Sequence, residues 1–146
     1  MEEVELPQLS QPAAELPVCG KLYIDLEFAS PTAFMFFGED VLYPSPARLL
    51  FSAARTYAEL CGGDLRADVL GLLKVVELTR YSVRTYWVDI GEGRRVPCFM
   101  GRARLTACGR RDVVTVVGLM RVAELCGVGI SRALGFGRVR VRVSAE

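Results

Sequence analysis

The chain has 146 residues, of which 51% are apolar, and its formal net charge is +1. This length is enough for one domain with a hydrophobic core and short for two independent domains. The chain has no histidine, and its five cysteines form no Cys-x-x-Cys pair, which argues against a zinc site. We expect a protein without a metal or another cofactor.

The first residues do not predict a secretory signal peptide. Three of the first five residues are glutamates, and no apolar segment of a signal peptide follows them. The longest apolar runs fall well short of the ~20 residues that cross a membrane. We therefore expect a soluble, cytoplasmic protein with no membrane partner.

Charge is distributed unevenly along the chain. Residues 1–78 contain 5 basic and 12 acidic side chains, a balance of −7, whereas residues 79–146 contain 13 basic and 5 acidic ones, a balance of +8. A basic half within a nearly neutral chain is typical of a protein that turns one surface toward nucleic acid.

The proline-rich residues 1–18 predict a linker-like tail, which leaves 19–146 as the domain. Alternating apolar and polar residues predict strands, whereas helices are indicated by caps such as Ser45 followed by Pro46 and by apolar residues on one face. The predicted elements, in chain order, are a strand over 21–29, a helix from Pro46 to Gly62, a short helix over 68–78, strands over 79–90 and 96–107 joined as a hairpin, a helix from Asp112 to Cys126, and a strand over 135–144.

This βαββαβ order, with one extra short helix, predicts an α+β fold: a single ferredoxin-like (RRM-like) domain with an antiparallel sheet. The usual strand order of that fold is 4-1-3-2. The first strand then lies between the last strand and the third.

Four glycines are concentrated between the last predicted helix and the last strand, at Gly127, Gly129, Gly135 and Gly137. Such a loop can expose main-chain amides to an anion, and Arg132 and Arg138 beside it can bind phosphate oxygens. A dinucleotide-binding loop would instead follow a strand and open a helix, and the Gly-Lys-Ser/Thr end of a P-loop is missing. We therefore predict a contact for a polyanion backbone; the alternative is a helix C-cap followed by a tight turn.

Arginines of the last strands predict a basic strip on the sheet. Asp25 and Glu27 of the first strand would face Arg102, Arg104, Arg138, Arg140 and Arg142 of its two neighbours. Two carboxylates cannot neutralise five guanidinium groups, even before Arg80 and Arg84 are counted. We expect the unpaired groups to bind phosphates, and the candidates for stacking on unpaired bases are Tyr23, Tyr81, Tyr86, Trp87 and Phe136.

The loop Gly127-Val-Gly-Ile-Ser-Arg-Ala-Leu-Gly-Phe-Gly137 ahead of a final strand resembles the signature of the RAMP superfamily of CRISPR-associated proteins. It is most similar to the repeat-RNA processing endoribonucleases, the sixth numbered Cas family. Three further segments resemble the C-terminal half of that family: Phe-Ala-Ser-Pro-Thr-Ala-Phe at 28–34, Pro-Ser-Pro at 44–46 and Phe-Met-Gly at 99–101. Together these segments cover most of residues 21–144.

The resemblance implies a ferredoxin-like RAMP domain that binds the CRISPR repeat transcript. The expected RNA-binding residues are Gly127, Gly129, Ser131, Arg132, Gly135, Phe136, Gly137, Arg138 and Arg140. Because the family normally pairs this domain with a similar N-terminal one, the further expected partner is a second Cas polypeptide or a second copy of the chain.

Members of this family cut RNA without a metal, by attack of a 2′-hydroxyl on the adjacent phosphate, often with a histidine of the N-terminal half as the base. Since this chain has no histidine, we assign no catalytic residue; Lys21 and Tyr23 have nothing in their spacing that sets them apart. Three hypotheses stay open: an RNA-binding half that does not cut alone, a complete histidine-free endoribonuclease, and a ferredoxin-like regulatory or protein-interaction module.

Overall fold

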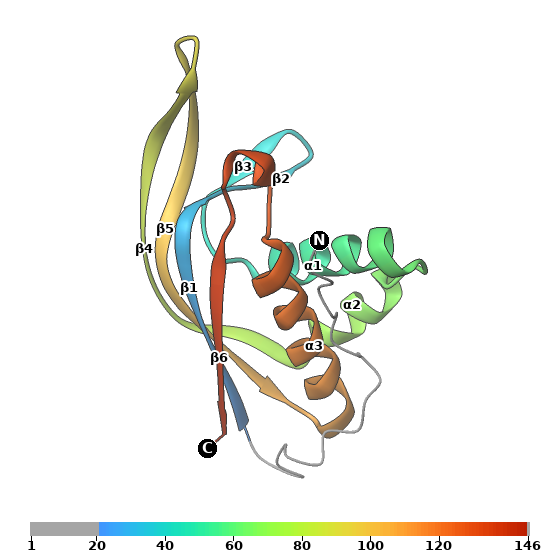
Figure 1. The fold of residues 1–146 in the computed structure, drawn as a ribbon. Helices are drawn as coiled ribbons and strands as arrows, with labels where there is room; N and C mark the ends of the chain where they lie inside the picture. The colour runs from blue at the N-terminus through green and yellow to red at the C-terminus, as the bar shows by residue number, and fades with distance from the viewer. Residues whose placement is uncertain (1–20, 146) are drawn as a thin grey trace.

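The computed structural model describes residues 21–145, so the tail expected over 1–18 lies outside the described residues. A four-stranded antiparallel sheet in the order β4-β5-β1-β6 has its helices on one face (Figure 1). This order is the expected 4-1-3-2, and the ferredoxin-like fold is confirmed. The elements are β1 (Lys21–Thr32), β2 (Phe34–Phe36), β3 (Glu39–Val41), α1 (Pro46–Cys61), α2 (Arg66–Leu72), β4 (Val76–Gly91), β5 (Arg94–Cys108), α3 (Arg110–Cys126), a 3-10 turn (Arg132–Leu134) and β6 (Val139–Ala145).

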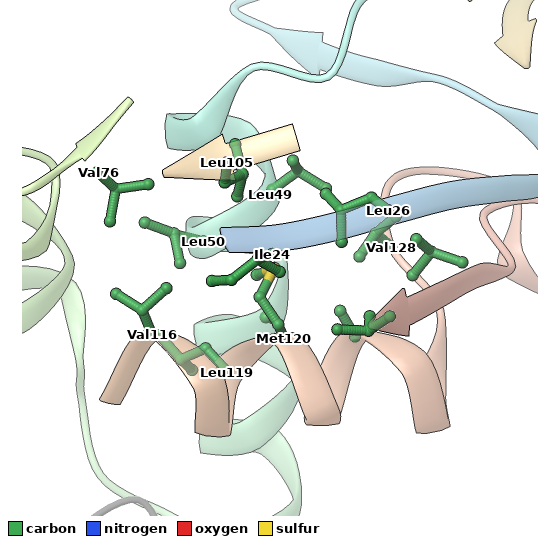
Figure 2. Close-up of a cluster of buried hydrophobic side chains, with 14 of the residues drawn as sticks. Ile24, Leu26, Leu49, Leu50, Val76, Leu105, Val116, Leu119, Met120 and Val128 are labelled. Atoms are coloured by element: carbon green, nitrogen blue, oxygen red, sulfur yellow. The ribbon is translucent and has the colours of Figure 1, made fainter. Parts of the chain in front are cut away.

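The central strand β1 separates a buried layer from an open one. Ile24 and Leu26 are at most 2% exposed and point toward the helices, because successive side chains of a strand alternate between its two faces. Figure 2 shows Ile24 among side chains of α1 and α3, including Leu50 and Met120. Complete burial of one such side chain contributes about 1.5–3 kcal/mol, so this layer holds the sheet against the helices.

Helix α1 begins where the sequence predicts, and α3 does not. The Ser45 hydroxyl accepts a hydrogen bond from the Arg48 amide at 3.4 Å, and Pro46 occupies the first turn. Helix α3 begins at Arg110, directly after its N-cap Gly109, so the predicted start at Asp112 was wrong. Asp112 lies in the first turn instead, where its charge still favours the helix dipole.

Other boundaries also differ from the prediction. The helix expected over 68–78 ends at Leu72, and Val76 already belongs to β4. The short hairpin β2–β3 was not predicted. The last strand begins at Val139 instead of Gly135, because a 3-10 turn precedes it and because Gly135 and Gly137 have positive φ angles. Within residues 21–145, no helix combines the length and the apolar content needed to span a membrane.

Strands β4 and β5 form the predicted hairpin, which turns at Gly91–Arg94. Their outer part projects from the body as a two-stranded arm (Figure 1), because β1 pairs with β5 only as far as Phe99. A small second core of Ala33, Cys98 and Phe136 connects this arm with the glycine-rich loop.

The glycine-rich loop is anchored to the body through its own amides. The amide of Gly129 donates to the Ser52 hydroxyl at 2.9 Å, and that of Gly137 donates to the Pro31 carbonyl at 2.8 Å. A Cβ atom on Gly137 would overlap the carbonyl oxygen of Val128, and Gly137 has a φ of +78°. Glycine is therefore required here for close contact between main chains.

Replacement of Gly137 should destabilise the fold. Gly137→Ala combines a positive φ with a backbone clash, so we expect a loss of about 2–4 kcal/mol in the free energy of unfolding. Gly135→Ala is the matched control, because Gly135 also has a positive φ but meets no atom within 4 Å. Urea denaturation of both variants measures the difference, and equal losses would contradict the packing role of Gly137.

Candidate nucleic-acid interface

The face of the sheet opposite the helices is open and carries a basic groove. The groove has a volume of about 610 Å³. Its charged lining residues are Asp25, Glu27, Arg80, Arg102, Arg104, Arg140 and Arg142. We call the five arginines of this set the arginine strip.

Strand pairing places each carboxylate of the groove between two arginines. Asp25 of β1 is in register with Arg104 of β5 and Arg142 of β6. Glu27, two residues later, is in register with Arg102 and Arg140. The predicted arrangement of acids and arginines on neighbouring strands is confirmed.

Only one of these cross-strand neighbours forms an ion pair in the described residues. Arg104 donates from Nε to Oδ1 of Asp25 at 2.8 Å and from Nη2 to Oδ2 at 3.2 Å. Its guanidinium carbon also lies 4.6 Å from the centre of the Tyr23 ring. The hydrogen bonds that Arg104 donates to Asp25 raise the pKa of Arg104 above its ordinary value. Arg104 is thus held in one orientation by two neighbours.

The other four arginines of the strip form no ion pair with the carboxylates that the structure describes. Among residues 21–145, no carboxylate lies within 4.0 Å of the guanidinium groups of Arg80, Arg102, Arg140 or Arg142. The excess of positive charge expected from the sequence is therefore present, and it lies on one face. Such an uncompensated strip attracts a polyanion by Coulomb forces that salt would screen.

The glycine-rich loop divides into an anchored base and an exposed tip. The amides of Gly127, Gly129, Gly135 and Gly137 donate to protein oxygens, so none of the four glycine amides is available to a phosphate. The tip runs from Ser131 to Gly135, both in left-handed conformations. The amide of Leu134 donates to the Ser131 carbonyl, so the prediction that main-chain amides of this loop contact phosphates now depends on the other amides of the tip.

The two arginines of the loop lie in different settings. Arg132 donates from Nη1 to the hydroxyl of Thr56 at 2.8 Å, which connects the tip to α1. Arg138 is anchored through its amide, which donates to the Ser30 hydroxyl at 2.9 Å, while its side chain is exposed. Because strand residues alternate, Arg138 extends the row of Arg140 and Arg142 toward the loop.

Of the predicted stacking residues, Phe136 is buried, so its prediction was wrong. It is only 6% exposed and packs in the second core with Cys98, so its ring cannot stack on a base. The glycines on either side suggested an exposed ring, but the apolar side chains around Phe136 bury it. Tyr81 and Trp87 are 57% and 61% exposed on β4, whereas Tyr23 is half-buried beside Arg104.

An exposed pair of aromatic rings at the β2–β3 turn was not predicted from the sequence. Phe37, at the β2–β3 turn, is 91% exposed, and its ring contacts that of Phe36 at a centroid distance of 4.5 Å. Arg48 lies over Phe36 at 4.7 Å. The signal in the sequence was the run Phe36-Phe37-Gly38, which is an apolar pair ahead of a turn glycine.

The groups that could bind a metal or act as nucleophiles are few. Within residues 21–145, no three acidic or cysteine side chains come together as metal ligands. Burial raises the pKa of the Cys98 thiol, whose Sγ donates to the Tyr86 carbonyl at 3.4 Å. That thiol stays protonated at neutral pH and is a poor nucleophile.

Comparisons with known proteins agree with this geometry. Residues 26–139 match the family model described as CRISPR-associated endoribonuclease Cas6. A CRISPR-associated endoribonuclease Cas6 of Mycobacterium tuberculosis is 32% identical over 122 residues, which cover 80% of this chain and 38% of that protein. A second one, of Streptococcus thermophilus, is 24% identical over 154 residues and covers 94% of this chain and 63% of that protein.

Solved structures show the same fold. A Cas6 product complex superposes with a TM-score of 0.70 at 25% identity, over 82% of this chain and 51% of that one. Cas6 of Thermus thermophilus superposes with a TM-score of 0.71 at 19% identity, over 82% of this chain and 53% of that one. This chain thus spans about half the length of these structures and less of the mycobacterial relative. The match over 26–139 shows that the chain belongs to the family of CRISPR-associated Cas6 endoribonucleases.

Proposed function

We propose that this domain binds CRISPR repeat RNA on the open face of its sheet, and that it does not cut the RNA by itself. The observation that carries the proposal is the unpaired part of the arginine strip. Arg102 and Arg140 lie on either side of β1 without a carboxylate partner in the described residues. Single phosphate contacts add up along such a strip, since each one releases counterions.

The loop extends this surface. Arg138 continues the row of Arg140 and Arg142 on β6. The exposed tip, Ser131 to Gly135, precedes Arg138 in the chain by only a few residues. Anchoring of the base of the loop fixes where Arg138 begins that row, so the contact is preorganised and costs less ordering entropy on binding. We propose phosphate contacts for Arg132, Arg138 and Arg140, and main-chain contacts for the tip.

Cleavage of RNA needs a proton-transfer group that the arginines and the loop do not supply. Transfer of a proton at neutral pH requires a side chain with a suitable pKa, most often histidine, and the chain contains none. The relatives named as endoribonucleases are longer than this chain. We propose that a second Cas polypeptide or a second copy of the chain joins this domain in an assembly that cuts.

Removal of the unpaired arginines should weaken RNA binding and its salt dependence. For Arg102→Ala with Arg140→Ala, we expect the slope of log K against log salt to fall by about 2 and the affinity at low salt to fall at least tenfold. Fluorescence anisotropy with labelled repeat RNA across a salt series measures both quantities.

The matched control removes two arginines from the helical side. Arg55 and Arg66 are 83% and 80% exposed and pair with Glu59 and Asp64. Arg55→Ala with Arg66→Ala changes the net charge equally, so an equal loss in slope would show that only net charge matters. A wild-type chain without a salt slope would favour the protein-interaction module.

The two loop arginines should behave differently. Arg138→Ala should lower RNA affinity several-fold without changing the unfolding midpoint, because its side chain is exposed and only its amide is anchored. Arg132→Ala should lower both the RNA affinity and the unfolding midpoint, because it also loses the hydrogen bond to Thr56, a contact of about 1 kcal/mol. Anisotropy and urea denaturation test this, and unchanged affinity in both variants would remove the loop from the RNA site.

The pure chain should leave repeat RNA intact in EDTA. We expect binding without a cut when end-labelled repeat RNA is incubated with the protein and separated on a denaturing gel. A site-specific product would instead support the hypothesis of a complete histidine-free endoribonuclease, since this chemistry needs no metal.

A further inference from the structure

Glu27 is the carboxylate of the groove that no cation holds in the described residues. It lines the groove on β1, between Arg102 and Arg140. Asp25, the other carboxylate, accepts two hydrogen bonds from Arg104. Among the side chains that the structure describes, no guanidinium or ammonium nitrogen lies within 4.0 Å of Glu27. Two acids in equivalent register positions therefore have different roles, one structural and one available.

An available carboxylate in a basic groove works against the binding of a polyanion. Its charge repels the phosphates that Arg102 and Arg140 attract, and none of the described side chains forms an ion pair with it that would explain its presence. A group of this kind favours binding only where the ligand places a hydrogen-bond donor against it. Otherwise its desolvation rejects the ligand.

The spacing of the strands indicates which donor would reach Glu27. Neighbouring strands lie about 4.8 Å apart, so Glu27 is one spacing from the arginines on either side. The ribose is bonded directly to the phosphate, so its hydroxyl is the donor nearest to a phosphate held by either arginine, whereas the amino groups of the base lie farther along the nucleotide. The ribose 2′-hydroxyl is a donor, and it is the group that distinguishes RNA from DNA.

We propose that Glu27 accepts a hydrogen bond from a ribose 2′-hydroxyl of the bound strand and thereby makes the groove selective for RNA over DNA. This inference rests on the proposed function and assigns one residue to its selectivity. The ionised carboxylate only accepts hydrogen bonds, and a bond from a hydroxyl to it is short and strong. DNA offers no donor at that carbon, so the carboxylate would face the phosphates without compensation.

The test compares repeat RNA with DNA of the same sequence. The wild-type protein should prefer RNA, and Glu27→Met should reduce the ratio of the two dissociation constants about tenfold, the order of a hydrogen bond to a charged group. DNA affinity should rise, because the repulsion is lost. Glu27→Gln should give an intermediate ratio, since its amide oxygen still accepts a hydrogen bond but carries no charge.

A scan of single 2′-deoxy substitutions through the RNA locates the contact. At one position the deoxy nucleotide should weaken binding to the wild-type protein and leave binding to Glu27→Met unchanged. If the preference lost in Glu27→Met instead follows the identity of a base, the carboxylate reads a base amino group and the proposal is overturned.

Glu59→Met is the control for charge. Glu59 lies on α1, on the other side of the sheet, and is 56% exposed, so its loss should leave the RNA-to-DNA ratio unchanged. A wild-type ratio near one, or an unchanged ratio in both Glu27 variants, would overturn the role of Glu27. A wild-type chain that binds RNA without a salt slope would reject the proposed function itself.

Discussion

The two-sided character of β1 is the constraint on which the rest of the structure depends. Its apolar residues, such as Ile24, are buried against α1 and α3, and its charged residues, such as Asp25, lie on the open face. A shift of one residue in register would exchange the two sets and expose the core. Burial therefore fixes the register, and the register fixes which arginines lie beside which carboxylates.

The charges of the open face are arranged in rows that cross the sheet. In the Asp25 row, the carboxylate is occupied, because Arg104 is paired with it and lies over the Tyr23 ring. The Glu27 row has no ion pair within the described residues. A surface built in this way combines one fixed cation with several available ones. This combination suits a ligand that carries many equivalent negative charges.

The glycine-rich loop serves the fold before it serves a ligand. Its base is held by hydrogen bonds to β1, to α1 and to the segment that leads into β2, and Gly137 packs against a main-chain carbonyl. These contacts determine where β6 begins and hence where its arginines lie. A glycine pattern that a chain shares with a family can therefore reflect packing requirements as well as ligand binding. Phe136, whose ring is buried within the same loop, is a second residue of the pattern that serves packing.

The sequence by itself determined the βαββαβ succession of the main elements, the two faces of β1, the start of α1 and the excess of arginine on the sheet, because alternation, capping and charge are local patterns. Only the tertiary structure decided which groups are occupied. It buried Phe136, used the amides of Gly129 and Gly137, paired Arg104 and left Glu27 without an ion pair among the described side chains. Those outcomes depend on contacts between segments far apart in the chain, such as Asp25 with Arg104 and Gly129 with Ser52, and no local pattern encodes the geometry of such contacts.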